Sequence, residues 1–88
     1  MNQIENKILD IIKEVVPDLT LDNMTEELTF EEVGINSINF IAIVISLEEH
    51  FDIEITDELL IMENMNTIKK IENILKTYGI EEVSVLDE

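Results

Sequence analysis

Hydrophobic residues recur at steps of three and four near the start of the chain, and this spacing predicts an amphipathic helix from Ile4 to Val16. Polar residues, Glu5 among them, fill its other face. Pro17 ends the helix, because a proline disfavours the helical conformation of the residue before it. The positions expected in the core are Ile4, Ile8, Ile11, Ile12 and Val15.

A second helix is predicted from Ser37 to about His50, and it is apolar on two sides. One apolar side consists of Ile38, Ile41 and Ile45 and is offset from the other. A helix of this kind either lies centrally or presents one side to a partner. The side expected to face the core consists of Phe40, Ile43, Val44, Leu47 and then Phe51.

The two helices are joined by a long connection, residues 17–36, in which turn-forming residues alternate with apolar anchors. A connection of this length without structure of its own would be unusual in a compact domain. We therefore expect it to pack onto the core through Leu28, Phe30 and Val33, with one short turn of helix near residues 29–33.

The remaining residues predict a short helix and then a longer one. Residues 51–55 alternate like a strand but have no second strand to pair with, so we expect an extended link. Thr56 then caps a short third helix that runs to about Met62, and residues 63–66 form a loop. Thr67 caps the last helix. The core positions of this helix are Ile68, Ile71, Ile74, Leu75 and Tyr78.

These elements together predict an all-α fold, a small four-helix bundle with three main helices, a short third helix and a long connection between the first two. Gly79 stands where a glycine often ends a helix. A chain of 88 residues supports one modest core, so we expect a single domain over residues 1–79. The acidic residues 80–88 are expected to form a flexible tail.

Charge and composition narrow the classes of partner and compartment. The net charge of −16 argues against nucleic acid or anionic membranes and favours partners with basic surfaces. The absence of cysteine excludes a disulfide framework and thiolate metal sites. The N-terminus does not resemble a signal peptide, and no apolar stretch approaches the roughly 18 residues of a membrane span. We therefore expect a soluble protein of the cytoplasm. We also expect it to be a monomer.

Few residues of this sequence are candidates for catalysis or for metal binding. His50 falls at a helix C-terminus, where a solvated histidine is favoured, and no catalytic triad can be assembled around it. Residues 22–26 lack the alternating oxygen ligands and the glycine of a calcium-binding loop. The sequence therefore predicts neither an enzyme nor a metal site, but a small module on which other proteins act.

Ser37 is the remaining candidate. Asn36 can cap the second helix, which places Ser37 at the first helical position with its hydroxyl outward. A phosphodiester attached there would lie beside unpaired backbone N–H groups and the positive end of the helix dipole. Gly34 allows the chain to turn sharply into the helix. From spacing alone, an ordinary serine at a helix start is the commoner explanation.

The stretch from Val33 to Ile41, VGINSINFI, resembles the phosphopantetheine attachment site of acyl carrier proteins. The family motif reads Leu-Gly-x-Asp-Ser-Leu, followed by an apolar helix that ends in Leu-Glu-Glu-x-Phe. This chain has LEEHF, from Leu47 to Phe51, at the matching distance. The resemblance extends over roughly residues 3–79, which makes it far more specific than a short motif.

The resemblance implies that a phosphopantetheinyl transferase esterifies Ser37 with 4′-phosphopantetheine from coenzyme A, at a site shaped by Gly34 and Asn36. The thiol of the arm would then carry an acyl or aminoacyl group as a thioester. The carrier performs no chemistry but presents this group to loading and condensing enzymes with basic or apolar docking surfaces. The docking residues implied are Ile38, Asn39, Ile41, Ile45, Glu48 and Glu49.

Several positions depart from the family pattern. Asn36 replaces the usual aspartate but can still cap the helix. Acidic residues usual on the next two turns are replaced by Asn39 and Ala42, so only Glu48 and Glu49 keep their charges. The more apolar docking surface favours a specialised polyketide or nonribosomal peptide pathway over fatty-acid synthesis. The alternative function is an unmodified, acidic helical module that binds a basic partner.

Overall fold

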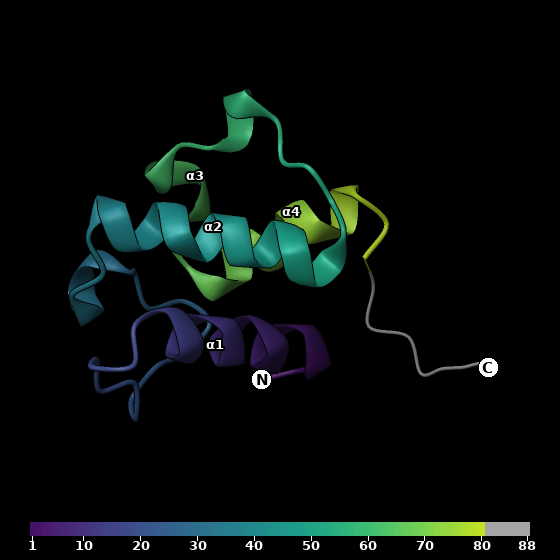
Figure 1. Cartoon of the computed structure of the whole chain (residues 1–88). Helices are drawn as coiled ribbons and strands as arrows, with labels where there is room; N and C mark the ends of the chain where they lie inside the picture. Colours follow the sequence, from purple (N-terminus) through teal and green to yellow (C-terminus); the bar gives the residue numbers. More distant parts are fainter. Residues whose placement is uncertain (81–88) are drawn as a thin grey trace.

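Helix α1 (Gln3–Val15) packs against both α2 (Ser37–Phe51) and α4 (Ile68–Thr77), and the short helix α3 (Met62–Met65) packs on α4 (Figure 1). The computed structural model describes residues 1–80 of the chain. No strand occurs among these residues. The predicted all-α bundle, with three main helices and a short third one, is confirmed.

The first helix begins one residue earlier than predicted, because Asn2 caps it. The Asn2 side chain accepts a hydrogen bond from the Glu5 N–H at 2.8 Å, and the Asn2 N–H donates to the Glu5 carboxylate at 2.9 Å. The helix ends at Val15, close before Pro17. Val15 itself is only half-buried. The remaining predicted core positions are buried, namely Ile4, Ile8, Ile11 and Ile12.

Helix α2 has the two apolar sides that the sequence predicts. The exposed side consists of Ile38, Ile41 and Ile45, whose side chains are 78%, 57% and 51% exposed. Phe51, at the end of the helix, is half-buried. The other side packs against α1 and the rest of the core through Phe40, Ile43, Val44 and Leu47. The helix therefore stabilises the fold with one side and leaves the other exposed.

The connection between α1 and α2 packs down as predicted. It contains the 3₁₀ turn η1 (Glu31–Val33), which falls within the predicted residues 29–33. The Phe30 side chain is fully buried, and Leu28 and Val33 are half-buried against the core. The apolar anchors therefore fix the path of the chain up to the start of α2.

The predicted third helix from Thr56 to Met62 is wrong. Only a 3₁₀ turn, η2 (Asp57–Leu59), forms there, and α3 covers residues that were expected to be mostly loop. The Thr56 side chain makes no capping hydrogen bond, so the local start signal is not used. Met65 is fully buried in the core, and α3 packs on α4. Tertiary packing rather than local capping therefore decides where the short helix lies.

The link after α2 is shorter than the predicted residues 51–55, because Phe51 is the last residue of the helix. Asp52 ends α2 in the left-handed conformation, with φ of 54°. Ile55 is buried, and its N–H donates to the Glu48 carboxylate at 2.9 Å. The hydrophobic side chain and this hydrogen bond together hold the link against α2.

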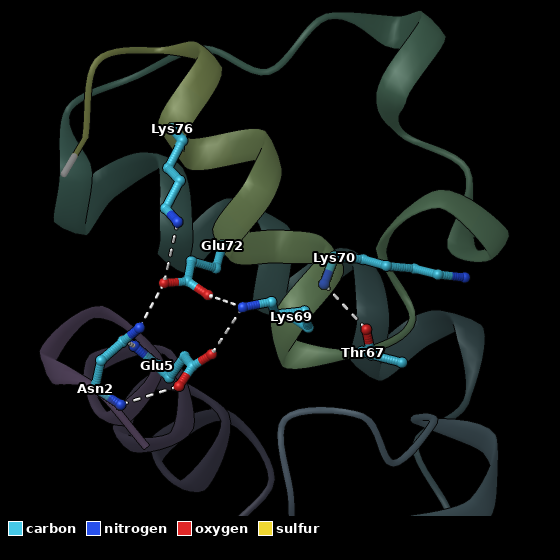
Figure 2. A network of polar contacts seen from close by, with 7 residues as sticks. All are labelled: Asn2, Glu5, Thr67, Lys69, Lys70, Glu72 and Lys76. Carbon is cyan, nitrogen blue, oxygen red and sulfur yellow. Dashed lines mark hydrogen bonds and ion pairs between the residues drawn. The ribbon is translucent and has the colours of Figure 1, made fainter. Parts of the chain in front are cut away.

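The last helix begins where the sequence predicts. The Thr67 hydroxyl accepts a hydrogen bond from the Lys70 N–H at 3.0 Å, so the predicted cap is confirmed (Figure 2). Three of its predicted core positions are buried and two are half-buried. The buried ones are Ile68, Ile71 and Leu75, and the half-buried ones are Ile74 and Tyr78.

Gly79 adopts a left-handed conformation, with φ of +86°, just after α4. The Ile80 N–H then donates to the Leu75 carbonyl at 3.0 Å, as in a glycine-ended helix. Of the predicted tail, residues 80–88, all but this first residue lie outside the described part of the chain. The domain boundary at residue 79 stays a prediction.

Two buried carboxylates lie between α1 and α4, and the sequence did not predict them (Figure 2). Glu5, expected on the polar face of α1, is only 5% exposed, and Glu72 is 1% exposed. The Asn2 amide donates to Glu72, with 2.6 Å between Nδ2 and Oε2. The Lys69 Nζ lies 3.5 Å from Glu72 and 4.0 Å from Glu5, and the Lys76 Nζ lies 3.8 Å from Glu72. These partners offset the cost of taking the carboxylates out of water.

The environment of Glu72 lowers the pKa of its carboxyl group. Burial alone raises this pKa, but the hydrogen bond from Asn2, the contact with Glu5 and the charges of Lys76 and Lys69 outweigh it. The pKa therefore lies below its ordinary value of 4.5. A lowered pKa in the folded state stabilises the fold above the unfolded pKa, and this stabilisation is lost as the pH falls through the folded pKa.

We expect Glu72→Gln to reduce the dependence of stability on pH. At neutral pH the variant should melt at a lower temperature than the parent, because Lys69 and Lys76 lose a charged partner. As the pH falls below about 4.5, the two melting temperatures should converge, because glutamine takes up no proton. Thermal unfolding followed by circular dichroism at several pH values would measure this. Glu54→Gln, which alters an exposed carboxylate, is the control, and an equal response of both variants would contradict the role of Glu72.

Candidate functional site

Ser37 is the first residue of α2, and its side chain is exposed, as predicted. Within residues 1–80 its hydroxyl makes no hydrogen bond, so the oxygen is free to react. Asn36 caps the helix, because its side-chain oxygen accepts the Asn39 N–H at 2.8 Å. In return the Asn39 side chain accepts the Asn36 N–H at 3.3 Å. This reciprocal cap orients the first turn and presents Ser37 at its tip.

The start of α2 is electrostatically suited to an anion. Among the described residues, the N–H groups of Ser37 and Ile38 have no hydrogen-bond acceptor. The first turn of this 15-residue helix contains no acidic side chain, since Asn36 and Asn39 make the cap neutral. Unpaired N–H groups and the helix dipole both favour a negative group at this end. The residues present therefore fit a phosphodiester on the Ser37 oxygen.

The chain approaches Ser37 through a tightly hydrogen-bonded turn. Gly34 is left-handed, with φ of +91°, and its N–H donates to the Glu31 carbonyl at 3.2 Å. This conformation favours glycine, which explains the residue at this position. The Phe30 carbonyl accepts the N–H of Ile35, a buried residue, at 2.9 Å. These bonds fix the backbone up to the helix cap.

The turn η1 has its own cap. The Thr29 N–H and hydroxyl donate to the Glu32 carboxylate at 2.9 and 2.8 Å. These two hydrogen bonds, the backbone one first, lower the pKa of Glu32 despite a small opposing effect of burial. The cap stabilises η1 just before Gly34 and so supports the approach to the site.

The predicted docking residues divide into two groups. Ile38, Ile41 and Ile45 are exposed and recur at helical spacing beside Ser37, and Glu49 is exposed farther along α2. Asn39 and Glu48 are half-buried and also have structural contacts. Asn39 belongs to the cap of α2, and Glu48 accepts the hydrogen bond from the Ile55 N–H. The part of the predicted set without a structural contact therefore consists of Glu49 and the three isoleucines. We call Ile38, Ile41 and Ile45 the apolar docking surface, after the role that the sequence predicts for them.

A catalytic histidine, a metal site and a membrane-spanning helix are three further features to consider in the described residues. The His50 Nε2 lies 3.5 Å from a carboxylate oxygen of Glu14, and both side chains are exposed. No group of three or more His, Cys, Asp or Glu side chains among residues 1–80 could hold a metal ion. No helix in this part of the chain is long and apolar enough to span a membrane.

Sequence reasoning missed how the approach to Ser37 is tied to a distant part of the chain. The Phe30 N–H donates to the Asn66 carbonyl at 2.8 Å, and the Lys69 N–H donates to the Glu26 carbonyl at 2.8 Å. Both bonds join backbone groups, which every residue type carries. The amino-acid sequence therefore contains no signal for them.

Comparisons with known proteins identify related sequences. The sequence model of the family described as "Phosphopantetheine attachment site" matches residues 6–75, which include Ser37. The chain is 46% identical over 57 residues to an acyl carrier protein homolog of Mycoplasmopsis pulmonis, covering 65% of this chain and 71% of that protein. It is 33% identical over 78 residues to an acyl carrier protein of Buchnera aphidicola subsp. Baizongia pistaciae, covering 89% of this chain and 97% of that protein. No solved structure gives a significant match.

Proposed function

The chain belongs to the acyl carrier protein family, and from this premise we propose that Ser37 is the residue that carries its arm. The arm is 4′-phosphopantetheine, attached covalently, and the protein is a carrier that is not itself an enzyme. The observation that carries the proposal is an exposed, unbonded Ser37 hydroxyl at the start of α2, within the matched region. Gly34 and Asn36 support it by shaping the approach and capping the helix.

Attachment requires a phosphopantetheinyl transferase and coenzyme A. The Ser37 oxygen forms a new bond to phosphorus while the pyrophosphate bond of coenzyme A breaks. Adenosine 3′,5′-bisphosphate leaves, and the transferase takes the hydroxyl proton. The chain's own contribution is to expose the nucleophile and to place the resulting anion beside the free N–H groups of Ser37 and Ile38.

The apolar docking surface offers partner enzymes a contact next to the attachment point. Three exposed isoleucines that recur along one side of a helix beside a reactive group are typical of a binding surface. Glu49 provides a charge on the same helix, and the net charge of −16 favours partners with basic residues around an apolar centre. Asn39, in the helix cap, and Glu48, which holds the link, complete the proposed docking residues.

We expect Ile41→Ala to raise the KM of a phosphopantetheinyl transferase for the carrier by roughly five- to thirtyfold, which corresponds to about 1–2 kcal/mol of binding energy. The Ile41 side chain is mostly exposed, so stability should change little. The matched control is Ile61→Ala, which truncates an exposed isoleucine outside α2. Steady-state kinetics with both variants measures the effect. An equal KM for the two variants would mean that the apolar docking surface is not used.

The identity of the acyl or aminoacyl group depends on the biosynthetic pathway in which the carrier works. The apolar docking surface favours a specialised polyketide or nonribosomal peptide pathway, whereas the relatives are named only as acyl carrier proteins. Intact-protein mass spectrometry of the carrier isolated from its native host would identify the cargo. A polyketide or aminoacyl group would support this preference, and a series of straight-chain fatty acyl groups would contradict it.

The attachment itself is tested by co-expression with a promiscuous phosphopantetheinyl transferase. The intact mass of the protein should increase by that of one arm, and peptide fragmentation should locate the arm on Ser37. An unchanged mass would favour the unmodified acidic module that binds a basic partner. We also propose that the carrier is a monomer in the cytoplasm. Size-exclusion chromatography would test whether it is a monomer.

A further inference from the structure

Two backbone hydrogen bonds join segments that lie far apart in the sequence, and both bonds connect the same pair of segments. The Phe30 N–H donates to the Asn66 carbonyl, and the Lys69 N–H donates to the Glu26 carbonyl, each at 2.8 Å. Glu26 and Phe30 lie in the connection that leads to Ser37, whereas Asn66 and Lys69 lie between α3 and the first turn of α4. The turn between α3 and α4 is therefore bonded directly to the approach to the site.

The position of Phe30 in turn restricts the backbone that leads to the cap of α2. The Phe30 side chain is fully buried, so its backbone cannot shift without disturbing the core. Its carbonyl accepts the N–H groups of Val33 at 3.1 Å and Ile35 at 2.9 Å. Ile35 is itself buried and immediately precedes the capping residue Asn36. The position of the cap, and of the serine after it, is thus set from the turn between α3 and α4.

The Asn66 side chain provides a second contact. Its amide nitrogen donates to the Glu31 carboxylate at 3.4 Å, and its amide oxygen accepts the Lys70 ammonium group at 3.0 Å. Lys70 also donates to the Glu63 carbonyl at 2.9 Å, which joins α3 to α4. The Glu31 carbonyl in turn accepts the Gly34 N–H at 3.2 Å. The side chain of Asn66 therefore contacts η1, from which the chain turns towards Ser37, in addition to the backbone bond at Phe30.

We propose that Phe30 and Asn66 are positioning residues for the attachment of the arm, because they hold the first turn of α2 against the turn between α3 and α4. The proposal rests on the proposed function of Ser37. Helix ends fray unless their caps are held, and a nucleophile must keep a narrow range of positions to react at full rate. The apolar docking surface fixes the body of α2 on the transferase, whereas Phe30 and Asn66 fix the end that carries the hydroxyl.

The test separates docking from positioning by comparing the KM with the single-turnover rate at saturating transferase and coenzyme A. Phe30→Leu should lower the single-turnover rate by roughly tenfold or more with an unchanged KM, because the exposed isoleucines are intact. The control for a loss of stability is Ile8→Ala, a truncation of a fully buried residue in α1. This control should melt at a lower temperature but keep the parent's rate at temperatures where it is folded.

A second pair of variants tests the side chain of Asn66. Asn66→Ala should lower the single-turnover rate by roughly two- to fivefold and speed hydrogen exchange at the Ile35 N–H. Asn64→Ala, which changes an exposed neighbour on α3, should alter neither. The double variant Asn66→Asp with Glu31→Gln exchanges the hydrogen-bond donor and acceptor between these two side chains. It should therefore restore the single-turnover rate of the parent.

The outcomes distinguish this proposal from the proposed function. If the parent is modified at Ser37 and both Phe30→Leu and Asn66→Ala react at its rate, the positioning role is overturned and the carrier function stands. If the parent takes up no arm, or takes it up elsewhere, the proposed function fails and the positioning role fails with it. A lower rate in both variants with an unchanged KM, together with a normal rate in Ile8→Ala, supports the positioning role.

Discussion

Ser37→Ala should abolish uptake of the phosphopantetheine arm completely, whereas Ser46→Ala should leave it unchanged. The alanine variant lacks the only atom through which the arm can be attached at this position. The fold should persist, because Asn36 rather than Ser37 caps α2 and because the Ser37 hydroxyl has no hydrogen bond within the described residues. Intact-protein mass spectrometry after co-expression with a promiscuous transferase measures the effect.

Ser46 is the control because it is a second serine on the same helix, half-buried and away from the first turn. Its variant therefore removes a hydroxyl from α2 without touching the attachment point. Circular dichroism of both variants should show the helix content of the parent. Addition of an arm to Ser37→Ala would mean that a different residue is modified, and loss of the arm in Ser46→Ala would indicate an effect on α2 as a whole.

Leu47→Ala should reduce the free energy of unfolding by about 2–5 kcal/mol, because it removes a fully buried side chain and leaves a cavity in the core. For a domain of this size, such a loss is a large share of the total stability. Phe40→Ala should have a similar effect, since Phe40 is also buried. Ile45→Ala, two residues from Leu47 in the sequence, should cost less than about 1 kcal/mol, because its side chain is 51% exposed.

Urea unfolding monitored by circular dichroism would test this contrast. The variants should differ in the midpoint of unfolding and share the same slope, which reports the surface exposed on unfolding. Ile41→Ala, on the same exposed side as Ile45, should behave like Ile45→Ala in this assay. If all four variants lost stability equally, the division of α2 into a buried and an exposed side would be wrong.

The long helices could be predicted because their signals are local. Repeats of isoleucine and leucine at helical spacing placed α1, α2 and α4, and Pro17, Asn36 and Thr67 placed their ends within one or two residues. The exposed side of α2 followed from the same spacing. The position of Ser37 at the start of α2 depended only on a cap and a glycine, both of which act within a few residues.

The short helix could not be predicted in the same way. Thr56 followed by two acidic residues carries a start signal, yet the chain forms only a 3₁₀ turn there. A four-residue helix such as α3 has too few internal hydrogen bonds to be stable alone. Its place is decided by the burial of Met65 in the core, a contact that no local pattern shows.

By itself, the sequence determined the helical class of the protein, its three long helices, the two sides of α2 and the exposure of Ser37. These features depend on the spacing of apolar residues and on caps, which act over one or two turns. Only the tertiary structure decided that Glu5 and Glu72 are buried with Lys69 and Lys76 beside them. Only the tertiary structure also showed that Phe30 is hydrogen-bonded to the turn after α3. Such contacts form between distant residues or through backbone groups, and their partners are chosen by packing rather than by neighbours in the chain.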